Sequence, residues 1–377
     1  MTATPLHQLV DLGQSPWLDH ISRSFVAGGG LEGLVADGIL GLTSNPTIFE
    51  EAIAAGHAYD DQLCELSEIT DDPKEIFLAL AAQDIRAACD VMARAFAAEP
   101  TRDGWVSMEV DPTLANDAAA TVAEARRIFE LIGRPNLFVK IPGTESGLQA
   151  IEETIAAGIP VNVTLLFSLE RHRAAGEAYL RGLRRLRAAG GDLRSVASVA
   201  SFFVSRVDTE TDRRLDELGG HDQLKGRLAI ANAKLAYQGY KQLFSGAEWA
   251  ELEAAGASPQ RCLWASTSTK SPAYRDVMYV EELIGRQTVT TMPRETLEAF
   301  EDHGQAEPTL ERGLEEAQRT FEALAEAGID YDDVVAKLER DGVERFADSF
   351  RELLEGVRAK REQLRLGMTR RVRAVVR

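Results

Sequence analysis

The segment NLFVKIP (136–142) places one charged residue, Lys140, inside an otherwise apolar run. The apolar residues do not alternate with polar ones; they are Leu137, Phe138, Val139 and Ile141. A continuous apolar run indicates a strand that is buried on both faces, as the strands of parallel sheets are. The segment therefore predicts a buried parallel strand, and its lysine needs a separate explanation.

Short β-rich runs of this kind recur along the chain, and with 136–141 they number eight: 15–19, 38–44, 104–110, 159–167, 195–204, 261–267 and 287–292 are the others. Longer stretches with helical patterns lie between them, for example 73–98, 113–132, 168–189 and 222–244. Repeated strand–helix alternation is typical of an α/β fold of the (β/α)₈ TIM-barrel type. An open doubly wound sheet is the alternative, but the chain carries no strong dinucleotide-binding fingerprint.

The region after the eighth run keeps apolar residues at helical spacing, from about 294 to 360. We expect one TIM-barrel domain over residues 1–377. Its barrel would span about 15–295, with C-terminal helices at about 296–377 packed on it. The basic end of the chain, 365–377, is interpreted as a solvated helix end.

The composition is that of a globular protein, with 45% hydrophobic and 27% charged residues. The formal net charge of 42 − 60 = −18 argues against nucleic acid or an anionic membrane as the main partner. A pocket can still be locally positive on such a chain. No apolar run approaches the ~20 residues that cross a membrane, and the N-terminus does not resemble a signal peptide. We therefore expect a cytoplasmic protein.

Metal-binding and disulfide patterns are missing from the sequence. Cys64, Cys89 and Cys262 are scattered, and the six histidines show no ligand spacing. We expect neither a cofactor nor a metal.

Polar residues gather where the predicted strands run into the following loops, which is where TIM barrels carry their chemistry. They include Asp19, Asn45, Glu109, Lys140, Asn162, Thr164, Ser201, Arg206, Ser266 and Lys270. This set offers one strand amine, carboxylates, hydroxyls, amides and two outlying cations. It suits carbonyl chemistry at an amine, with the cations holding a phosphate.

Lys140 is the candidate nucleophile. Burial disfavours the charged form of an amine, and a neutral amine can attack a ketone carbon to form a Schiff base. Asp19 and Glu109 are the carboxylates available for proton transfer. The residues alone leave structural alternatives open: Lys140 could snorkel or pair with a carboxylate, and Asp19 could cap a turn.

The sequence resembles the transaldolase family in seven blocks that occur in the same order. They are WLDHISR (17–23), GLTSNPTIFEEAI (41–53), SMEVDP (107–112), FVKIPGTESGLQAI (138–151), GIPVNVTLLFSLERH (158–172), VASFFVSRVD (199–208) and LWASTSTKSPAYRDVMYVEELIG (263–285). The resemblance covers about residues 15–295. The version resembled is the longer form, which also occurs fused to a sugar-phosphate isomerase; no isomerase module is visible here.

The resemblance implies a role for most of the candidate residues. Lys140 matches the Schiff-base lysine, and Asp19 the acid/base at the bond that is cleaved. Glu109 and Thr164 match the pair that holds a water during imine formation. The remaining residues match substrate-binding positions: Asn45 and Asn162 for the hydroxyls of a dihydroxyacetone unit, Ser201 near its terminal hydroxyl, and Arg206 for phosphate.

One segment departs from the family's pattern. Shorter transaldolases place a second phosphate-binding arginine after the seventh strand, where this chain reads ASTSTK (265–270). Ser268 stands roughly at the arginine's position, and we expect Lys270 to supply the charge, with Ser266 also binding substrate. A solvated loop lysine is the alternative for Lys270.

The sequence therefore predicts a transaldolase that acts on sugar phosphates, as a monomer or homodimer. It would pass a dihydroxyacetone unit from sedoheptulose 7-phosphate to glyceraldehyde 3-phosphate. One alternative is a lyase of the fructose 6-phosphate aldolase kind, which releases free dihydroxyacetone. A remote alternative is a catalytically silent barrel that binds sugar phosphates.

Overall fold

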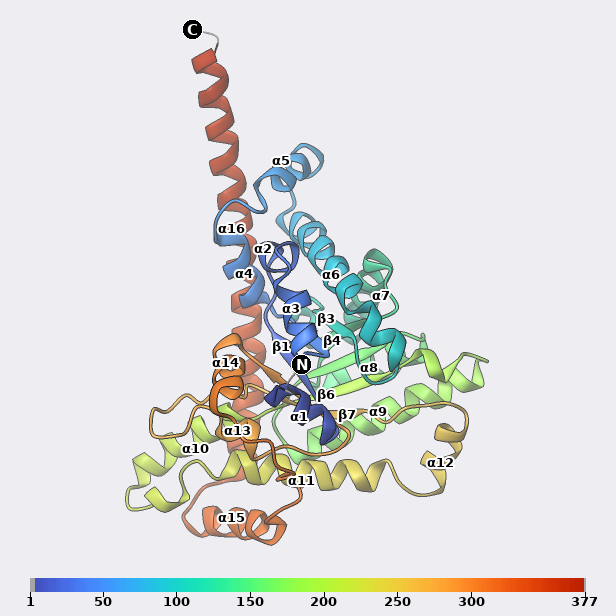
Figure 1. Ribbon diagram of the computed structural model, residues 1–377, viewed down its shortest axis with the longest axis vertical. Helices are drawn as coiled ribbons and strands as arrows, with labels where there is room; N and C mark the ends of the chain where they lie inside the picture. The colour runs from blue at the N-terminus through green and yellow to red at the C-terminus, as the bar shows by residue number, and fades with distance from the viewer. Residues whose placement is uncertain (1–3, 376–377) are drawn as a thin grey trace.

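Eight parallel strands form a closed barrel in chain order, and β8 pairs with β1 (Figure 1). The computed structural model describes the backbone of residues 4–375 and the side chains of residues 4–366. The strands are β1 (Gln14–Asp19), β2 (Gly41–Thr43), β3 (Trp105–Glu109), β4 (Leu137–Pro142), β5 (Val161–Leu166), β6 (Ser198–Phe203), β7 (Arg261–Ala265) and β8 (Thr288–Met292). Each strand overlaps one predicted run, so the predicted α/β barrel is confirmed.

Helices connect the strands and surround the barrel (Figure 1). Those of the first half are α1 (Pro5–Asp11), α2 (Arg23–Ala27), α3 (Gly30–Asp37), α4 (Pro46–Ala54), α5 (Asp60–Ile69), α6 (Pro73–Ala98), α7 (Ala118–Ile132) and α8 (Glu145–Ala156). The second half contains α9 (Leu169–Ala188), α10 (Ser205–Leu218), α11 (Leu228–Leu243), α12 (Ala247–Ala254), α13 (Met278–Glu281), α14 (Arg294–His303), α15 (Leu314–Glu326) and α16 (Tyr331–Val375). Short 3₁₀ turns lie at η1 (Pro112–Leu114), η2 (Leu193–Ser195) and η3 (Asp222–Leu224).

Two predicted helices begin later than the sequence pattern suggests. The helix expected from residue 113 begins at Ala118, because Asp117 caps it by accepting a hydrogen bond from the amide of Ala120. The helix expected from residue 222 begins at Leu228, because Gly226 adopts a left-handed φ of 68° that interrupts helical geometry.

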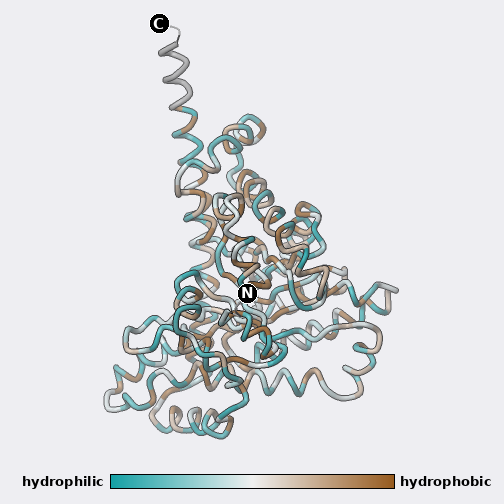
Figure 2. Tube along the Cα trace, in the orientation of Figure 1, coloured by the Kyte–Doolittle hydropathy of each residue, from teal (hydrophilic) through white to brown (hydrophobic). Residues whose placement is uncertain are grey.

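The inward face of the barrel carries an aromatic layer below its open end. The rings of Trp105 and Phe138 stack at 4.1 Å between centroids, and Trp17 stacks on Phe138 at 6.1 Å. Side chains two residues further along a strand point to the same face. The residues that point to the same face nearer the open end of the barrel are polar: Asp19, Glu109 and Lys140. Figure 2 shows hydrophilic and hydrophobic residues alternating along the outer helices, as expected where one helix face packs on the barrel.

A buried ionic network closes the other end of the barrel, where the strands begin. One nitrogen of the Arg261 guanidinium donates to Ser15 Oγ and to the Thr288 carbonyl, both at 2.6 Å. Ser15 in turn donates to Asp103 at 2.5 Å. This end is filled by side chains, so the polar residues at the opposite, carboxyl ends of the strands are the ones that can meet a ligand.

The long helix α16 runs along one side of the barrel and extends beyond α5 (Figure 1). It contacts α4, α5, α6 and α10, the turn η1 and the strand β5. Its buried apolar residues lie on one face, at intervals of three, four or eight positions: Val334, Leu338, Phe346, Phe350, Leu353 and Val357. This stripe attaches the helix to the barrel wall.

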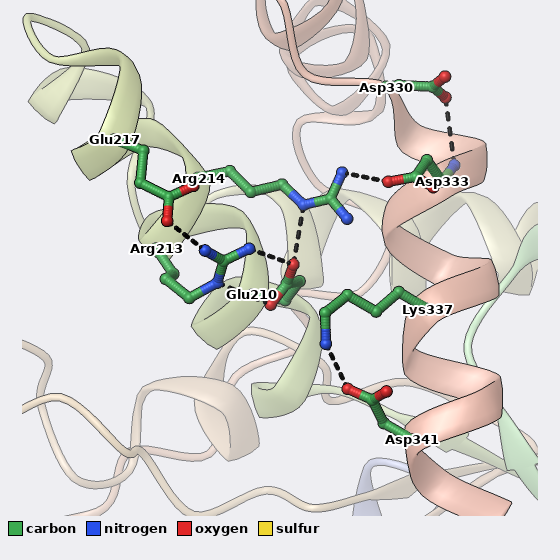
Figure 3. A network of polar contacts seen from close by, with 8 residues as sticks. All are labelled: Glu210, Arg213, Arg214, Glu217, Asp330, Asp333, Lys337 and Asp341. Atoms are coloured by element: carbon green, nitrogen blue, oxygen red, sulfur yellow. Dashed lines mark hydrogen bonds and ion pairs between the residues drawn. The ribbon is translucent and has the colours of Figure 1, made fainter.

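Charged side chains fix the first turns of α16 against α10 (Figure 3). Arg214 on α10 lies 2.8 Å from Glu210 on its own helix and 2.7 Å from Asp333 on α16. Lys337 pairs with Asp341 one turn further along α16. The network fixes both the rotation of α16 about its own axis and its position along that axis. Apolar packing alone fixes these two less specifically.

The C-terminal region differs from the prediction in one place. Residues 304–313, between α14 and α15, are not helical, and Pro308 lies within this break. Among the described residues, no helix is long and apolar enough to cross a membrane. In the basic end at 365–377, side chains from residue 367 onward and all of residues 376–377 lie outside the described part of the chain.

Candidate active site

A cavity of about 610 Å³ opens at the carboxyl ends of the strands. Eight of the ten predicted site residues line it: Asp19, Asn45, Lys140, Thr164, Ser201, Arg206, Ser266 and Lys270. The other two, Glu109 and Asn162, are buried in the strands on either side of Lys140, in register with it. The barrel thus brings together residues that are up to 251 positions apart in sequence (270 − 19).

Lys140 is 5% exposed and projects from β4 into the cavity. Its ammonium nitrogen donates to the Ser44 carbonyl at 3.1 Å and lies 3.7 Å from Glu109 Oε2. The ring of Phe346, on α16, lies 5.8 Å from the same nitrogen. The amine is therefore held by one carbonyl and one carboxylate, and it still borders the cavity.

Glu109 is the carboxylate with the most perturbed proton affinity in the site. Burial raises the pKa of Glu109 to about 7; the Lys140 charge opposes this rise, and Asp19 adds to it. Neither carboxylate oxygen has a hydrogen-bond partner among the described residues. The hydroxyl of Thr164, which lies on the next strand but one, is also buried and unpartnered there. Buried polar atoms without partners are the usual sign of a bound water or ligand.

Asp19 lies at the end of β1 and is held by hydroxyl groups. Thr43 Oγ1 donates to Asp19 Oδ1 at 2.6 Å and lies 2.8 Å from Thr291 Oγ1. The carboxylate borders the cavity with His20 beside it. Asp19 is thus oriented from one side and open to a ligand on the other.

The two candidate asparagines have different surroundings. Asn45 Oδ1 caps α4 by accepting from the Ile48 amide at 3.1 Å, so its Nδ2 is the atom it can offer to a ligand. Asn162 is fully buried; it donates to Ser107 at 3.0 Å and accepts from Ser201 at 2.7 Å. The structure brings Asn45 and Ser201 to the cavity surface and leaves Asn162 beneath Ser201.

Two cationic residues, Arg206 and Lys270, line the same cavity. Burial lowers the pKa of Arg206, as does the nearby charge of Arg345, while Asp19 opposes the shift. No carboxylate lies within ion-pairing distance of Arg206 among the described residues. Burial also lowers the pKa of Lys270, with Arg206 acting in the same direction. A bound anion would offset the repulsion between Arg206 and Lys270 that depresses the proton affinity of the lysine.

Local structure fixes the segment that carries Lys270 to the helix that carries Arg206. Lys270 donates to Ser268 at 2.7 Å. Ser266, which has a left-handed φ of 55°, lies with its hydroxyl 2.9 Å from that of Ser205 at the start of α10. Further along, Tyr279 donates to Asp208 of α10 at 2.9 Å. Tyr274 also donates, to Asp212.

Several lining residues were not predicted: His20, Thr43, Thr47, Ile48, Glu51, Phe203, Ala265, Ser268, Thr291, Pro293, Arg294, Glu295 and Phe346. Thr291 and Arg294 lie at the end of β8 and just after it, so the strand-end rule could have found them. Phe346 comes from α16, and no local sequence signal connects it with the barrel mouth. Within residues 4–366, no group of three or more His, Cys, Asp or Glu side chains is arranged to hold a metal ion.

Sequence similarity to known proteins identifies the family of this chain. The sequence pattern of the transaldolase/fructose-6-phosphate aldolase family matches residues 16–357. The transaldolase of Frankia alni is 49% identical over 356 residues, which cover 93% of this chain and 96% of the relative. The transaldolase of Acidothermus cellulolyticus is 50% identical over 95% of this chain and 99% of its own length. Transaldolase 1 of Streptomyces coelicolor is 48% identical over 94% of each. The chain therefore belongs to the transaldolase family.

Proposed function

We propose that this transaldolase moves a dihydroxyacetone unit from sedoheptulose 7-phosphate to glyceraldehyde 3-phosphate, a reaction of the pentose phosphate pathway. The products are erythrose 4-phosphate and fructose 6-phosphate. The observation that carries the assignment of roles is the buried Lys140 amine. It borders the cavity, lies 3.7 Å from Glu109, and shares the cavity with Arg206 and Lys270.

The first step is imine formation at Lys140. The neutral amine attacks the ketose carbonyl carbon, and the carbinolamine that forms loses its oxygen as water. That loss needs a proton on the hydroxyl, and the attack needs a base for the amine proton. Glu109 is suited to both, because a carboxyl group with a pKa of about 7 exchanges protons in either direction at neutral pH. A water between Glu109 and Thr164 would carry the proton.

Cleavage follows from the iminium, which withdraws electrons from the neighbouring carbon–carbon bond. Asp19 takes the proton of the hydroxyl group at that bond, the aldose leaves, and the three-carbon enamine stays attached to Lys140. The acceptor aldehyde then enters and the same steps run in reverse. Asn45 and Ser201 would bind the hydroxyl groups of the retained unit.

Arg206 and Lys270 would bind the phosphate groups of donor and acceptor. Arg206 can form a bidentate pair with phosphate oxygens, whereas a lysine offers a point charge. The position of Lys270 near Arg206, and the absence of a carboxylate partner for Arg206 in the described residues, support this assignment.

Trapping of the Schiff base tests the role of Lys140. We expect borohydride with fructose 6-phosphate to add a three- or six-carbon mass to the wild-type protein, and peptide mapping to find it on Lys140. The Lys140→Met variant should neither be labelled nor turn over. Lys234→Met is the matched control, since Lys234 is also buried at 7% exposure but lies on α11 outside the cavity. Labelling of another lysine would refute the proposal.

Product analysis separates transfer from the lyase alternative. With fructose 6-phosphate and erythrose 4-phosphate, a transferase yields sedoheptulose 7-phosphate, whereas a lyase yields free dihydroxyacetone at the same rate with or without the acceptor. Binding of sugar phosphates with neither product would point to a silent barrel.

The proposal includes a cytoplasmic location and a monomer or homodimer. The free thiols of Cys64, Cys89 and Cys262 support a reducing compartment. Light scattering coupled to size-exclusion chromatography would measure the assembly.

A further inference from the structure

Phe346 is a residue of the C-terminal helix that enters the cavity. It is 9% exposed and lines the cavity together with Lys140 and Arg206. Its ring lies 5.8 Å from the Lys140 nitrogen and 6.0 Å from the centre of the Arg206 guanidinium. The ring of Phe203, on β6, lies 6.5 Å away. One apolar ring therefore lies close to two of the cationic groups of the cavity.

The approach of α16 to the barrel mouth is close, and a glycine makes it possible. Gly342 lies one turn before Phe346, and a Cβ atom there would lie 3.1 Å from a Leu165 methyl group and 3.4 Å from the Phe167 ring. The ion pair between Arg214 of α10 and Asp333 holds the first turn of the same helix (Figure 3). The ring is thus fixed by its surroundings and is not free to swing out of the cavity.

The position of Phe346 beside Lys140 matters because the retained enamine can be lost to water. An enamine on Lys140 is lost when its nucleophilic carbon takes a proton from water and becomes an iminium. Water then hydrolyses the carbon–nitrogen bond, which releases dihydroxyacetone and restores the protonated amine. Transfer requires that the acceptor aldehyde arrives before this sequence occurs, so exclusion of water from the enamine decides which product forms.

We propose that Phe346 is the wall that keeps water from the Lys140 enamine, and that α16 thereby sets the partition between transfer and release. This inference rests on the proposed function of Lys140. It assigns to a helix outside the strand and loop framework a role in product specificity. The aromatic ring suits that role because it fills space without offering a proton to the enamine carbon.

The partition can be measured directly with Phe346→Leu and Phe346→Ala. Each protein is given fructose 6-phosphate with and without erythrose 4-phosphate, and free dihydroxyacetone and sedoheptulose 7-phosphate are quantified. We expect the ratio of release to transfer to rise about tenfold in Phe346→Ala and by less in Phe346→Leu, which stays apolar. Phe350→Leu and Phe350→Ala are the matched controls. Phe350 lies one turn further along α16 and packs against Phe77 at 5.8 Å, away from the cavity.

The outcomes distinguish this inference from the proposed function. A ratio within twofold of wild type in both Phe346 variants, with Lys140 still trapped by borohydride, overturns the role of Phe346 alone. An equal rise in the Phe350 variants also overturns it, since the effect would then come from loosening of the helix. Absence of the Lys140 adduct in wild type instead removes the proposed function. Should Phe346→Ala not fold, Phe346→Leu carries the same test.

Discussion

Glu109 and Lys140 are buried neighbours on β3 and β4, with the ammonium nitrogen 3.7 Å from the Glu109 carboxylate. Burial holds the carboxyl form of Glu109 up to a pH of about 7, against the pull of the Lys140 charge. Below that pH Glu109 cannot accept a proton, and above it the carboxylate can. A base in the free enzyme with this pKa makes kcat/KM rise as pH increases through about 7.

The Glu109→Gln variant tests that assignment. We expect kcat to fall at least about 100-fold, and the rise of kcat/KM near pH 7 to disappear, because the amide cannot take a proton. Glu124→Gln is the control, since Glu124 is a buried carboxylate that pairs with Lys74 outside the cavity. An unchanged pH profile in Glu109→Gln would assign the limb near pH 7 to another group.

Arg206 and Lys270 should differ in their contributions to phosphate binding. A charge-assisted hydrogen bond contributes roughly 1.5–3 kcal/mol, so its loss raises KM roughly 10- to 100-fold. We expect Arg206→Met to fall in this range and Lys270→Met below it, because a lysine is a point charge that lacks the guanidinium fork. Steady-state kinetics with fructose 6-phosphate measure the change, and the unphosphorylated substrate fructose should show none. Lys241→Met, on α11, is the control variant.

At the scale of elements, the strands could be predicted because each is a short, continuous apolar run. The site residues on these strands could be predicted because TIM barrels carry their functional residues at the carboxyl ends of the strands. Applying that rule needs no long-range information. The wall that α16 provides could not be predicted in this way. Phe346 has the helical spacing of any buried residue, and only the packing of α16 on the barrel decides that its ring meets Lys140. The break at 304–313 was missed because apolar spacing on both sides suggested one continuous helical region.

Two glycines of α16 allow the effect of helix propensity on stability to be measured apart from the effect of packing against the barrel. At Gly356 an added Cβ would meet nothing within 4 Å, so Gly356→Ala should raise the free energy of unfolding by about 0.8–1 kcal/mol through propensity alone. At Gly342 the same change crowds Leu165 and Phe167. We expect Gly342→Ala to bring no net stabilisation and to increase dihydroxyacetone release. Urea unfolding of both variants measures the difference in the free energy of unfolding. Equal stabilisation at the two positions would show that Leu165 and Phe167 move aside for the added methyl group without loss of stability.

At the scale of the whole molecule, we propose that the barrel and the C-terminal helices are one domain. The reason is that α16 buries an apolar stripe on the barrel and completes the wall of its cavity. A single thermal transition, followed both by helix content and by activity, is the expected result. A separate early loss of helix signal would indicate that α16 detaches on its own.

The whole molecule is negatively charged and repels its phosphorylated substrates, whereas the cavity itself is locally positive and attracts them. The chain carries a net charge of −18, whereas the lining of the cavity has four cationic and three acidic side chains, with His20 neutral. At about 10 mM salt the Debye length is roughly 30 Å, so an approaching phosphate ester feels the net charge. At about 100 mM it is roughly 10 Å, so only the charges of the cavity act on the substrate.

We therefore expect kcat/KM for fructose 6-phosphate to rise between these concentrations, and to fall again near 1 M, where contacts with Arg206 and Lys270 are screened. The Arg206→Met variant should keep the rise and lose most of the fall, and fructose should show neither. A steady fall from 10 mM upward would mean that the cationic side of the cavity dominates even at long range.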